Sequence, residues 1–173
     1  MPTFTKSLLV LGGARSGKSR HAQAIAEASG GDLVFIATAQ AFDGEMTDRI
    51  ARHRADRDAR WRTLEAPLDL AEAIAAEDRP GATILVDCLT LWASNLLLTD
   101  ADTDAAAQTL VATLARASAR IVLVSNEVGF GIVPDNALAR RFRDVAGLLN
   151  QRVAAVVSEV DFVIAGLPQR LKG

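Results

Sequence analysis

The sequence predicts one α/β domain in which a mostly parallel central sheet carries helices on both faces. Short apolar runs rich in Val, Ile and Leu are typical of strands buried on both faces, and they lie at residues 8–11, 33–37, 83–86, 121–124 and 162–164. Longer stretches rich in Ala, Arg, Glu and Leu lie between these runs and favour helices. Strands that alternate with helices require crossover connections, which make the sheet parallel.

The expected elements follow one another from a strand that runs straight into a glycine pair. Residues 8–11 precede Gly12-Gly13, and the helix-forming stretch 17–29 comes next. We expect the other helices at residues 44–60, 68–77, 103–119 and 136–157. The acidic segment 100–104 lacks the glycine and the distal glutamate of a calcium loop, so it predicts a surface turn that caps the helix at 103.

Size and charge narrow the classes of function. The 173 residues fit a single domain, residues 1–173, that is large enough to build its own core. Nineteen Lys and Arg against 21 Asp and Glu give a net charge of −2, so no overall basic field attracts nucleic acid or an anionic membrane. The single Cys88 cannot form an internal disulfide, and no apolar run approaches the roughly 18 residues of a membrane span. We therefore expect a cytoplasmic protein with no membrane span and no nucleic-acid partner.

The glycine-rich segment after the first strand matches the phosphate-binding pattern G-x-x-x-x-G-K-[ST]. Its residues are Gly12, Gly13, Ala14, Arg15, Ser16, Gly17, Lys18 and Ser19. Glycines let the backbone curl so that successive N–H groups point at phosphate oxygens, and the following helix presents its positive end to the same anion. Lys18 supplies positive charge to the β and γ phosphates, and the Ser19 hydroxyl is a ligand for Mg²⁺. The motif predicts nucleoside triphosphate binding but does not distinguish ATP from GTP.

Asp87 ends the apolar run at 83–86. In nucleotide-binding α/β folds an acid at the carboxyl end of a neighbouring strand holds Mg²⁺ or its water. We therefore expect Asp87 to act with Ser19 at a metal site. The alternative is that Asp87 only caps a following helix at residues 88–98.

One histidine lies among arginines in the segment 45–57. Arg49, His53 and Arg57 are spaced to fall on one side of a helix. Arginine forks bind phosphate oxygens, and a neutral imidazole beside them is able to attack a phosphorus atom. From these residues alone a solvated surface helix, in which Asp48, Asp56 and Asp58 balance the arginines, stays the more ordinary interpretation. His21, the other histidine, is expected to be a surface or packing residue of the first helix.

Ordered blocks along nearly the whole chain resemble the bifunctional adenosylcobinamide kinase / adenosylcobinamide-phosphate guanylyltransferase family of cobalamin biosynthesis. The blocks are LGGARSGKSR at 11–20, FIATA at 35–39, EMTDRIARHRADR at 45–57, WRTLEAP at 61–67, VDCLTLW at 86–92, VSNEVGFGIVP at 124–134, ARRFRDVAGLLNQ at 139–151 and AGLP at 165–168. They are far more specific than the phosphate-binding motif alone, and they favour a catalytic role for His53.

The resemblance implies two reactions on a RecA-like P-loop NTPase fold, with Mg²⁺ as cofactor and ATP and GTP as substrates. A nucleoside triphosphate phosphorylates adenosylcobinamide, and GTP then gives GMP to His53, from which it passes to adenosylcobinamide phosphate. Lys18 serves the kinase step. The family's nucleotide-contacting positions correspond here to residues 12–19 and to Ala37, Thr38, Ala39, Arg54, Ala55, Asp56, Arg57, Glu65 and Asp87. The resemblance also implies a homotrimer with a corrinoid substrate.

Other classes of protein remain as alternatives. A P-loop kinase for a small metabolite lacks the nucleotidyltransferase step, and it has no need of a covalent nucleotidyl-histidine at His53. A RecA-like ATPase that moves nucleic acid requires a basic surface bearing aromatic residues, which the negative net charge and the absence of Tyr disfavour. Asn126 and Glu127 follow the fourth apolar run, where α/β folds place ligands. Glu127 is either a general base or magnesium-water ligand, or a charge in a turn.

Overall fold

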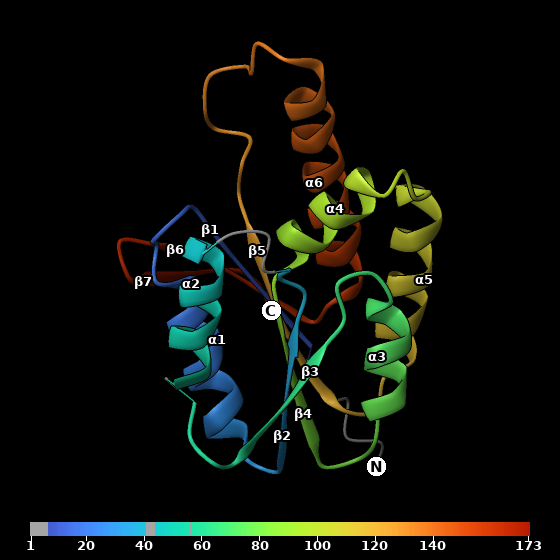
Figure 1. Cartoon of the computed structure of the whole chain (residues 1–173). Helices are drawn as coiled ribbons and strands as arrows, with labels where there is room; N and C mark the ends of the chain where they lie inside the picture. Colours follow the sequence, from blue (N-terminus) through green and yellow to red (C-terminus); the bar gives the residue numbers. More distant parts are fainter. Residues whose placement is uncertain (1–6, 41–43, 56) are drawn as a thin grey trace.

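The computed structural model describes residues 7–40, 44–55 and 57–173, without the side chains of Arg49 and His53 (Figure 1). The strands are β1 Leu8–Gly12, β2 Asp32–Ala37, β3 Trp61–Glu65, β4 Ala82–Asp87, β5 Arg120–Asn126, β6 Glu159–Ile164 and β7 Leu167–Lys172. The helices are α1 Lys18–Ser29, α2 Gly44–Ala55, α3 Leu70–Glu77, α4 Leu89–Leu98, α5 Thr103–Arg116 and α6 Ala137–Val156.

A single seven-stranded sheet organises the chain in the order β3-β2-β4-β5-β1-β6-β7. Every pairing from β3 to β6 is parallel, and only β7 runs antiparallel, to β6. The predicted mostly parallel sheet is therefore confirmed. Strand β1 lies between β5 and β6, so the segment that follows β1 emerges between the carboxyl ends of two parallel neighbours.

The two faces of the sheet are covered unequally. Successive side chains of a strand point to opposite faces, and in β1 the alternation sends Leu9 into one core and Leu8 and Val10 into the other. The larger core packs under α3, α4, α5 and α6, whereas the smaller core on the other face packs under α1 through Ala22 and Ala26. In Figure 1, α1 and α2 lie on one side of the sheet and α3 and α5 on the other. The thinner side leaves room for a pocket beside α1.

In the segment 44–65 one predicted helix was too long and one strand was missed. The predicted helix over 44–60 ends at Ala55, because Asp58 accepts hydrogen bonds from the backbone and side chain of Arg60 and closes a turn there. The chain then forms β3, an edge strand in which every side chain is half-buried or exposed, so it shows no buried apolar run. Trp61 anchors β3 by packing edge-on against Phe35, with ring centroids 6.2 Å apart.

Strand β7 was also missed, because all six of its residues are exposed and it carries no buried run. The expected N-cap before α5 is confirmed, since the Asp102 carboxylate accepts a hydrogen bond from Ala105 N at 3.0 Å. Among the residues that the structure describes, none of the helices combines the length and hydropathy needed to cross a bilayer.

Candidate functional site

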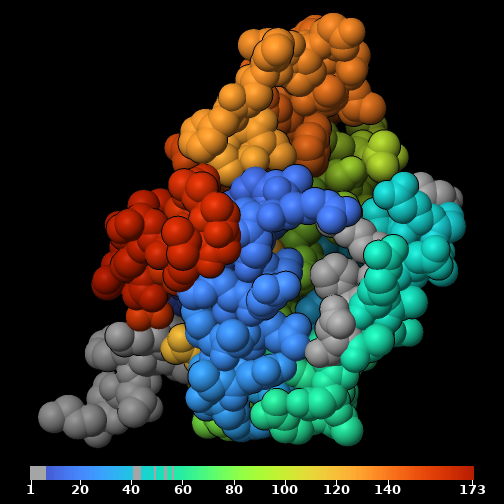
Figure 2. Space-filling model, turned by 90° about the vertical axis from the view of Figure 1, so that its left-hand side faces the viewer, coloured from blue at the N-terminus to red at the C-terminus, as the bar shows by residue number. Residues whose placement is uncertain are grey.

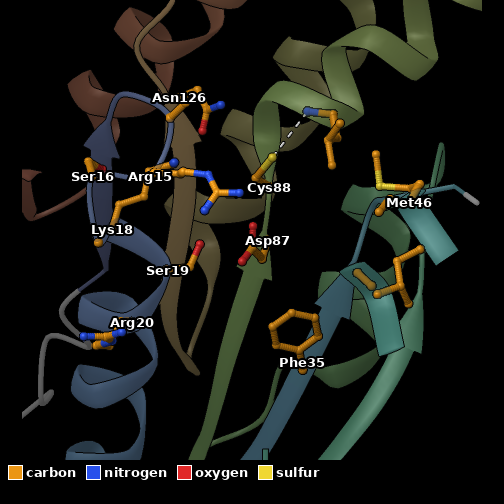
Figure 3. Close-up of a pocket in the computed structure, with 16 residues that line it drawn as sticks. Arg15, Ser16, Lys18, Ser19, Arg20, Phe35, Met46, Asp87, Cys88 and Asn126 are labelled. Carbon is orange, nitrogen blue, oxygen red and sulfur yellow. Dashed lines mark hydrogen bonds between the residues drawn. The ribbon is translucent and has the colours of Figure 1, made fainter. Parts of the chain in front are cut away.

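A pocket of about 460 Å³ opens at the carboxyl ends of β1, β2, β4 and β5, between α1 and α2 (Figures 2 and 3). Figure 2 shows the surface hollowed between the blue atoms of the segment after β1 and the cyan atoms of α2. The lining residues are Ala14, Arg15, Ser16, Gly17, Lys18, Ser19, Arg20, Phe35, Ala37, Ala39, Met46, Ile50, Asp87, Cys88, Leu91 and Asn126. The structure thus brings the predicted phosphate loop and Asp87 to one cavity.

The backbone of the phosphate loop is held from below by the turn between β6 and β7. Gly166 N donates a hydrogen bond to Ser16 O at 2.7 Å, and a Cβ on Gly12 would lie only 2.7 Å from Val163 O. Gly17 has a φ of +92°, a conformation that side chains disfavour. Glycine is therefore required at both positions by close packing or by backbone conformation.

Lys18 and Ser19 begin α1 on the wall of this pocket. Lys18 is only 9% exposed, and its Nζ donates a hydrogen bond to Gly13 O at 3.1 Å, which holds the ammonium group over the loop. The N-terminus of α1 adds the positive end of the helix dipole. The loop is thus a site for an anion with several oxygens.

Asp87 ends β4 on the same pocket wall as Ser19, and Figure 3 shows both side chains. The alternative in which Asp87 caps the next helix is not what the structure has. The N-cap of α4 is Cys88, whose Sγ accepts a hydrogen bond from Leu91 N at 3.4 Å. Burial raises the pKa of the Cys88 thiol to about 11, with a further contribution from the Asp87 carboxylate. Cys88 therefore stays a neutral thiol near pH 7.

The far side of the pocket is apolar. Phe35 of β2 faces it together with Met46 and Ile50 of α2 and Leu91 of α4. The Arg57 guanidinium lies over the Phe35 ring at 3.6 Å from its centroid. A flat apolar wall opposite a phosphate loop suits a nucleoside base and ribose.

Thr38, predicted as a nucleotide contact, has a structural role. It is fully buried, and its hydroxyl donates to Cys88 O at 2.7 Å and accepts from Cys88 N at 2.9 Å. These bonds tie the end of β2 to the start of α4. Ala37 and Ala39 on either side of it do line the pocket.

Asn126 was noted in the sequence, and the structure places it on the pocket wall at the end of β5. A buried polar network fixes its backbone, because Asn126 N donates to Thr90 Oγ1 at 2.7 Å and Asn126 O accepts from Asn150 Nδ2 at 3.1 Å. Ser125 completes the network with a 2.6 Å hydrogen bond to Asn150 Oδ1. Helices α4 and α6 therefore hold this edge of the pocket in place.

Glu127 is held by local hydrogen bonds beside the phosphate loop. Glu127 N donates to Gly12 O at 3.0 Å, and its carboxylate accepts from Gly129 N at 2.5 Å. The bond to Gly129 makes the carboxylate part of a turn, as one of the two interpretations of this residue expected.

His21 is a packing residue, as expected from the sequence. Its Nε2 lies 2.9 Å from Asp161 Oδ2. Asp161 is 5% exposed and also accepts a hydrogen bond from Arg170 of β7. Burial raises the pKa of Asp161, but the hydrogen bonds from Arg170 and His21 outweigh it, so the net pKa lies below the usual carboxyl range.

Other predicted nucleotide contacts lie outside the described pocket lining. They are Gly12, Gly13, Thr38, Arg54, Ala55, Arg57 and Glu65. Arg54 and Glu65 contact each other across 3.1 Å, which joins α2 to the end of β3. Asp56 lies outside the described residues, and for His53 only the backbone, within α2, is described. The sequence analysis did not find the apolar wall of the pocket. Nothing in the sequence distinguishes Phe35, Met46 and Ile50 from ordinary apolar residues of a strand and a helix.

Comparison with known proteins decides the family. Residues 8–171 match the model of the family described as "Cobinamide kinase / cobinamide phosphate guanyltransferase". The chain belongs to this family. It is an enzyme of this bifunctional class, a cobinamide kinase and cobinamide phosphate guanylyltransferase, and the resemblance found in the sequence is confirmed. The alternative of a kinase without the second step is not favoured.

Two curated relatives support the assignment along their whole length. The bifunctional adenosylcobalamin biosynthesis protein CobP of Pseudomonas aeruginosa is 53% identical over 95% of this chain and 96% of its own. The bifunctional adenosylcobalamin biosynthesis protein CobU of Escherichia coli K12 is 44% identical over 95% of this chain and 99% of its own. At the level of fold alone, the ATPase EscN of enteropathogenic E. coli superposes with a TM-score of 0.54 at 11% identity, covering 93% of this chain and 43% of that one. The predicted P-loop NTPase fold is confirmed.

Proposed function

We propose that the phosphate loop holds the triphosphate and carries the kinase step. The observation that carries this proposal is that the loop, Lys18, Ser19 and Asp87 open into one cavity. In the step, the acceptor hydroxyl oxygen bonds to the γ-phosphorus, the bond from that phosphorus to the β–γ bridging oxygen breaks, and the nucleoside diphosphate leaves. The hydroxyl proton is lost to solvent or to a base. Lys18 and the loop N–H groups stabilise the charge on the transferred group. ATP and GTP both fit this chemistry.

Ser19 and Asp87 are the residues that would hold Mg²⁺. A hydroxyl and a carboxylate are hard oxygen donors, and they share one pocket wall with the phosphate loop. Among the described residues there is no group of three or more His, Cys, Asp or Glu side chains that could bind a metal by itself. Mg²⁺ commonly binds one or two protein oxygen ligands together with substrate phosphates. When bound, the ion would neutralise charge on the triphosphate.

We propose His53 as the nucleophile of the guanylyl transfer. Helix α2 borders the pocket through Met46 and Ile50, and position 53 follows these at i+7 and i+3, a spacing that keeps one face of a helix. An imidazole nitrogen bonds to the α-phosphorus of GTP while the bond to the α–β bridging oxygen breaks and pyrophosphate leaves. A phosphate oxygen of cobinamide phosphate then displaces the histidine from the same phosphorus.

The remaining nucleotide contacts are proposed around these two centres. Ala37 and Ala39 line the pocket, and Arg57 lies beside its apolar wall at Phe35. Arg54 and Glu65 are both more than half exposed, so their ion pair is free to open toward a bound nucleotide. Thr38 supports the site by holding Cys88. Asp56 belongs to the same proposed set by its place in the sequence.

The wider setting is also a proposal. Residues 1–173 form a single catalytic domain in the cytoplasm without a nucleic-acid partner, as size, charge and the single cysteine predicted, and it acts as a homotrimer, as the resemblance implied. Light scattering of the purified protein tests the trimer.

The direct test of function is turnover. The protein is incubated with ATP or GTP and adenosylcobinamide, and the corrinoid products are identified by mass spectrometry. We expect cobinamide phosphate first, and then cobinamide-GDP with release of pyrophosphate when GTP is present. Phosphorylation without any later guanylyl transfer would support the kinase alone.

A further inference from the structure

Exposed apolar side chains flank the phosphate loop on the side away from the apolar wall of the pocket. Phe130 is 84% exposed and Ile132 97% exposed, and both follow β5 with the half-exposed Val133. Ile164 ends β6, and Leu167 of β7 pairs directly opposite it. We call these five residues the apolar rim. A group of large apolar side chains on the surface of a single chain marks a binding site.

The topology places the rim around the phosphate loop. Strand β1, which leads into the loop, lies between β5 and β6, so rim residues issue from the carboxyl ends of both neighbours. The edge-on contact of Phe130 with Phe162 of β6, at 6.3 Å between centroids, joins the two parts. In Figure 2 the orange segment after β5 stands above the blue atoms of the loop, and the red hairpin lies beside them.

Hydrogen bonds join the segments that carry the apolar rim to the phosphate loop. Glu127 N donates to Gly12 O, and Gly166 N donates to Ser16 O, so the two chain segments that carry the rim residues are each bonded to the phosphate loop. Residues 127–136 between β5 and α6 form neither helix nor strand. Their backbone therefore makes no regular ladder, and beyond the local bonds of Glu127, Gly129 and Pro134 it offers polar groups to a ligand.

We infer that the apolar rim binds the corrin ring of cobinamide and presents its hydroxyl to the γ-phosphate. This inference rests on the proposed kinase step. The pocket of about 460 Å³ has the volume of a nucleotide site, and its apolar wall is built by β2 and α2, at the other end of the strand order. In-line transfer requires the acceptor to approach the γ-phosphate opposite to the leaving oxygen, hence from the side of β5, β1 and β6.

The chemistry of the rim matches this acceptor. A corrin is a broad macrocycle edged with methyl groups and carboxamide side chains. Methyl groups bury favourably against Phe130 and Ile132, while the carboxamides find partners in the exposed irregular backbone at Gly131. A highly charged acceptor has no such match, since none of the five rim residues is charged.

Two serine variants test the rim, Ile132→Ser and Phe130→Ser, with Leu98→Ser as the matched control. Leu98 is 62% exposed at the end of α4 and does not belong to the rim. Because the rim side chains are exposed, folding should be unaffected. We expect each rim variant to raise the KM for cobinamide about tenfold, while the KM for ATP and the GMP labelling of the enzyme from GTP stay at the wild-type level.

Three outcomes overturn the inference. The first is an unchanged KM for cobinamide in both rim variants. The second is an equal change in Leu98→Ser. The third is a change in particle mass by light scattering with matching losses of both reactions, which would assign the rim to contacts between copies of the chain. Failure of the proposed function itself would show in the wild type, which would then phosphorylate no cobinamide and would overturn this inference with it.

Discussion

The phosphate loop and helix α2 border the same pocket, but the rest of the chain holds them in different ways. The loop is bonded to the β6–β7 turn and to the start of the segment after β5, and it leads into α1 on the sheet. In α2, no described side chain is buried and none belongs to either core. Hydrogen bonds to neighbouring segments fix the phosphate loop, whereas α2 borders the pocket without contributing a described side chain to either core.

From this difference we infer that the phosphate loop carries the phosphoryl transfer and that α2 carries the guanylyl transfer. Phosphoryl transfer depends on aligned charges, so a loop fixed by neighbouring strands suits it. Covalent guanylyl transfer needs a nucleophile that meets the α-phosphorus and later a second acceptor. A helix whose main contacts are with the pocket suits that exchange. Substitutions in the two regions should therefore affect different reactions.

The largest effect is expected from His53→Ala. Guanylyl transfer to cobinamide phosphate should fall below detection, because no other group takes the place of a covalent nucleophile. Phosphorylation of cobinamide should stay within about threefold of the wild type, since that step needs no histidine. Separate assays of the two products measure this. Equal loss of both reactions would contradict the proposal that His53 serves the guanylyl transfer alone.

Next in size is Lys18→Ala. The kinase rate should fall about 10²–10³-fold, because one fixed positive charge near the transferred phosphoryl group is removed. Lys172→Ala is the control, since Lys172 only bonds carbonyl oxygens at the end of α6. Steady-state phosphorylation of cobinamide gives the comparison. Near-normal turnover in Lys18→Ala would reject the loop as the kinase site.

A smaller effect is expected from Asp87→Asn, which keeps the shape of the side chain. Magnesium-dependent turnover should fall about 10–100-fold, while nucleotide binding without metal changes much less. Asp104→Asn, at an exposed carboxylate paired with Arg152, serves as control. Titration of turnover against Mg²⁺ concentration, beside metal-free binding, separates the two. If both fell together, Asp87 would hold structure rather than metal.

The smallest effect is expected on stability, from Asp161 of β6, which joins α1 to the β6–β7 hairpin. Asp161→Asn removes the charge that accepts hydrogen bonds from His21 and Arg170, and should cost about 1–3 kcal/mol of unfolding free energy. The folded pKa of Asp161 is lowered, so this stability is present above the ordinary carboxyl pKa and is lost as the pH falls through the folded value.

Urea denaturation of wild type and Asp161→Asn across pH 3 to 7 measures this loss. We expect a constant gap in unfolding free energy near neutral pH that narrows below about pH 4. A gap that persisted unchanged in acid would show that the charge of Asp161 does not stabilise the hairpin.

Much of the fold could be predicted because its strands are continuous apolar runs. The five predicted runs became β1, β2, β4, β5 and β6, which are the inner strands of the sheet. Strands β3 and β7 could not be predicted, because neither of these edge strands has a buried side chain and neither carries an apolar run. The Asp58 turn that ends α2 also has no apolar pattern.

The site divides in the same way. The phosphate loop and Asp87 could be predicted because motif and strand end fix their places. The apolar wall could not, since Phe35, Met46 and Ile50 meet only through the packing of β2 against α2. The supporting role of Thr38 was missed for a related reason, because its partner Cys88 lies 50 residues away in sequence.

The measurement that tests the account most directly is the mapping of the covalent GMP adduct. The wild-type enzyme is incubated with GTP labelled at the α-phosphorus, digested, and its peptides are identified by mass. We predict one GMP on His53 of α2, with release of pyrophosphate, in a bond that acid breaks and alkali does not, as a phosphoramidate requires. An adduct on His21 or on a serine of the phosphate loop, or no adduct at all, would contradict the account.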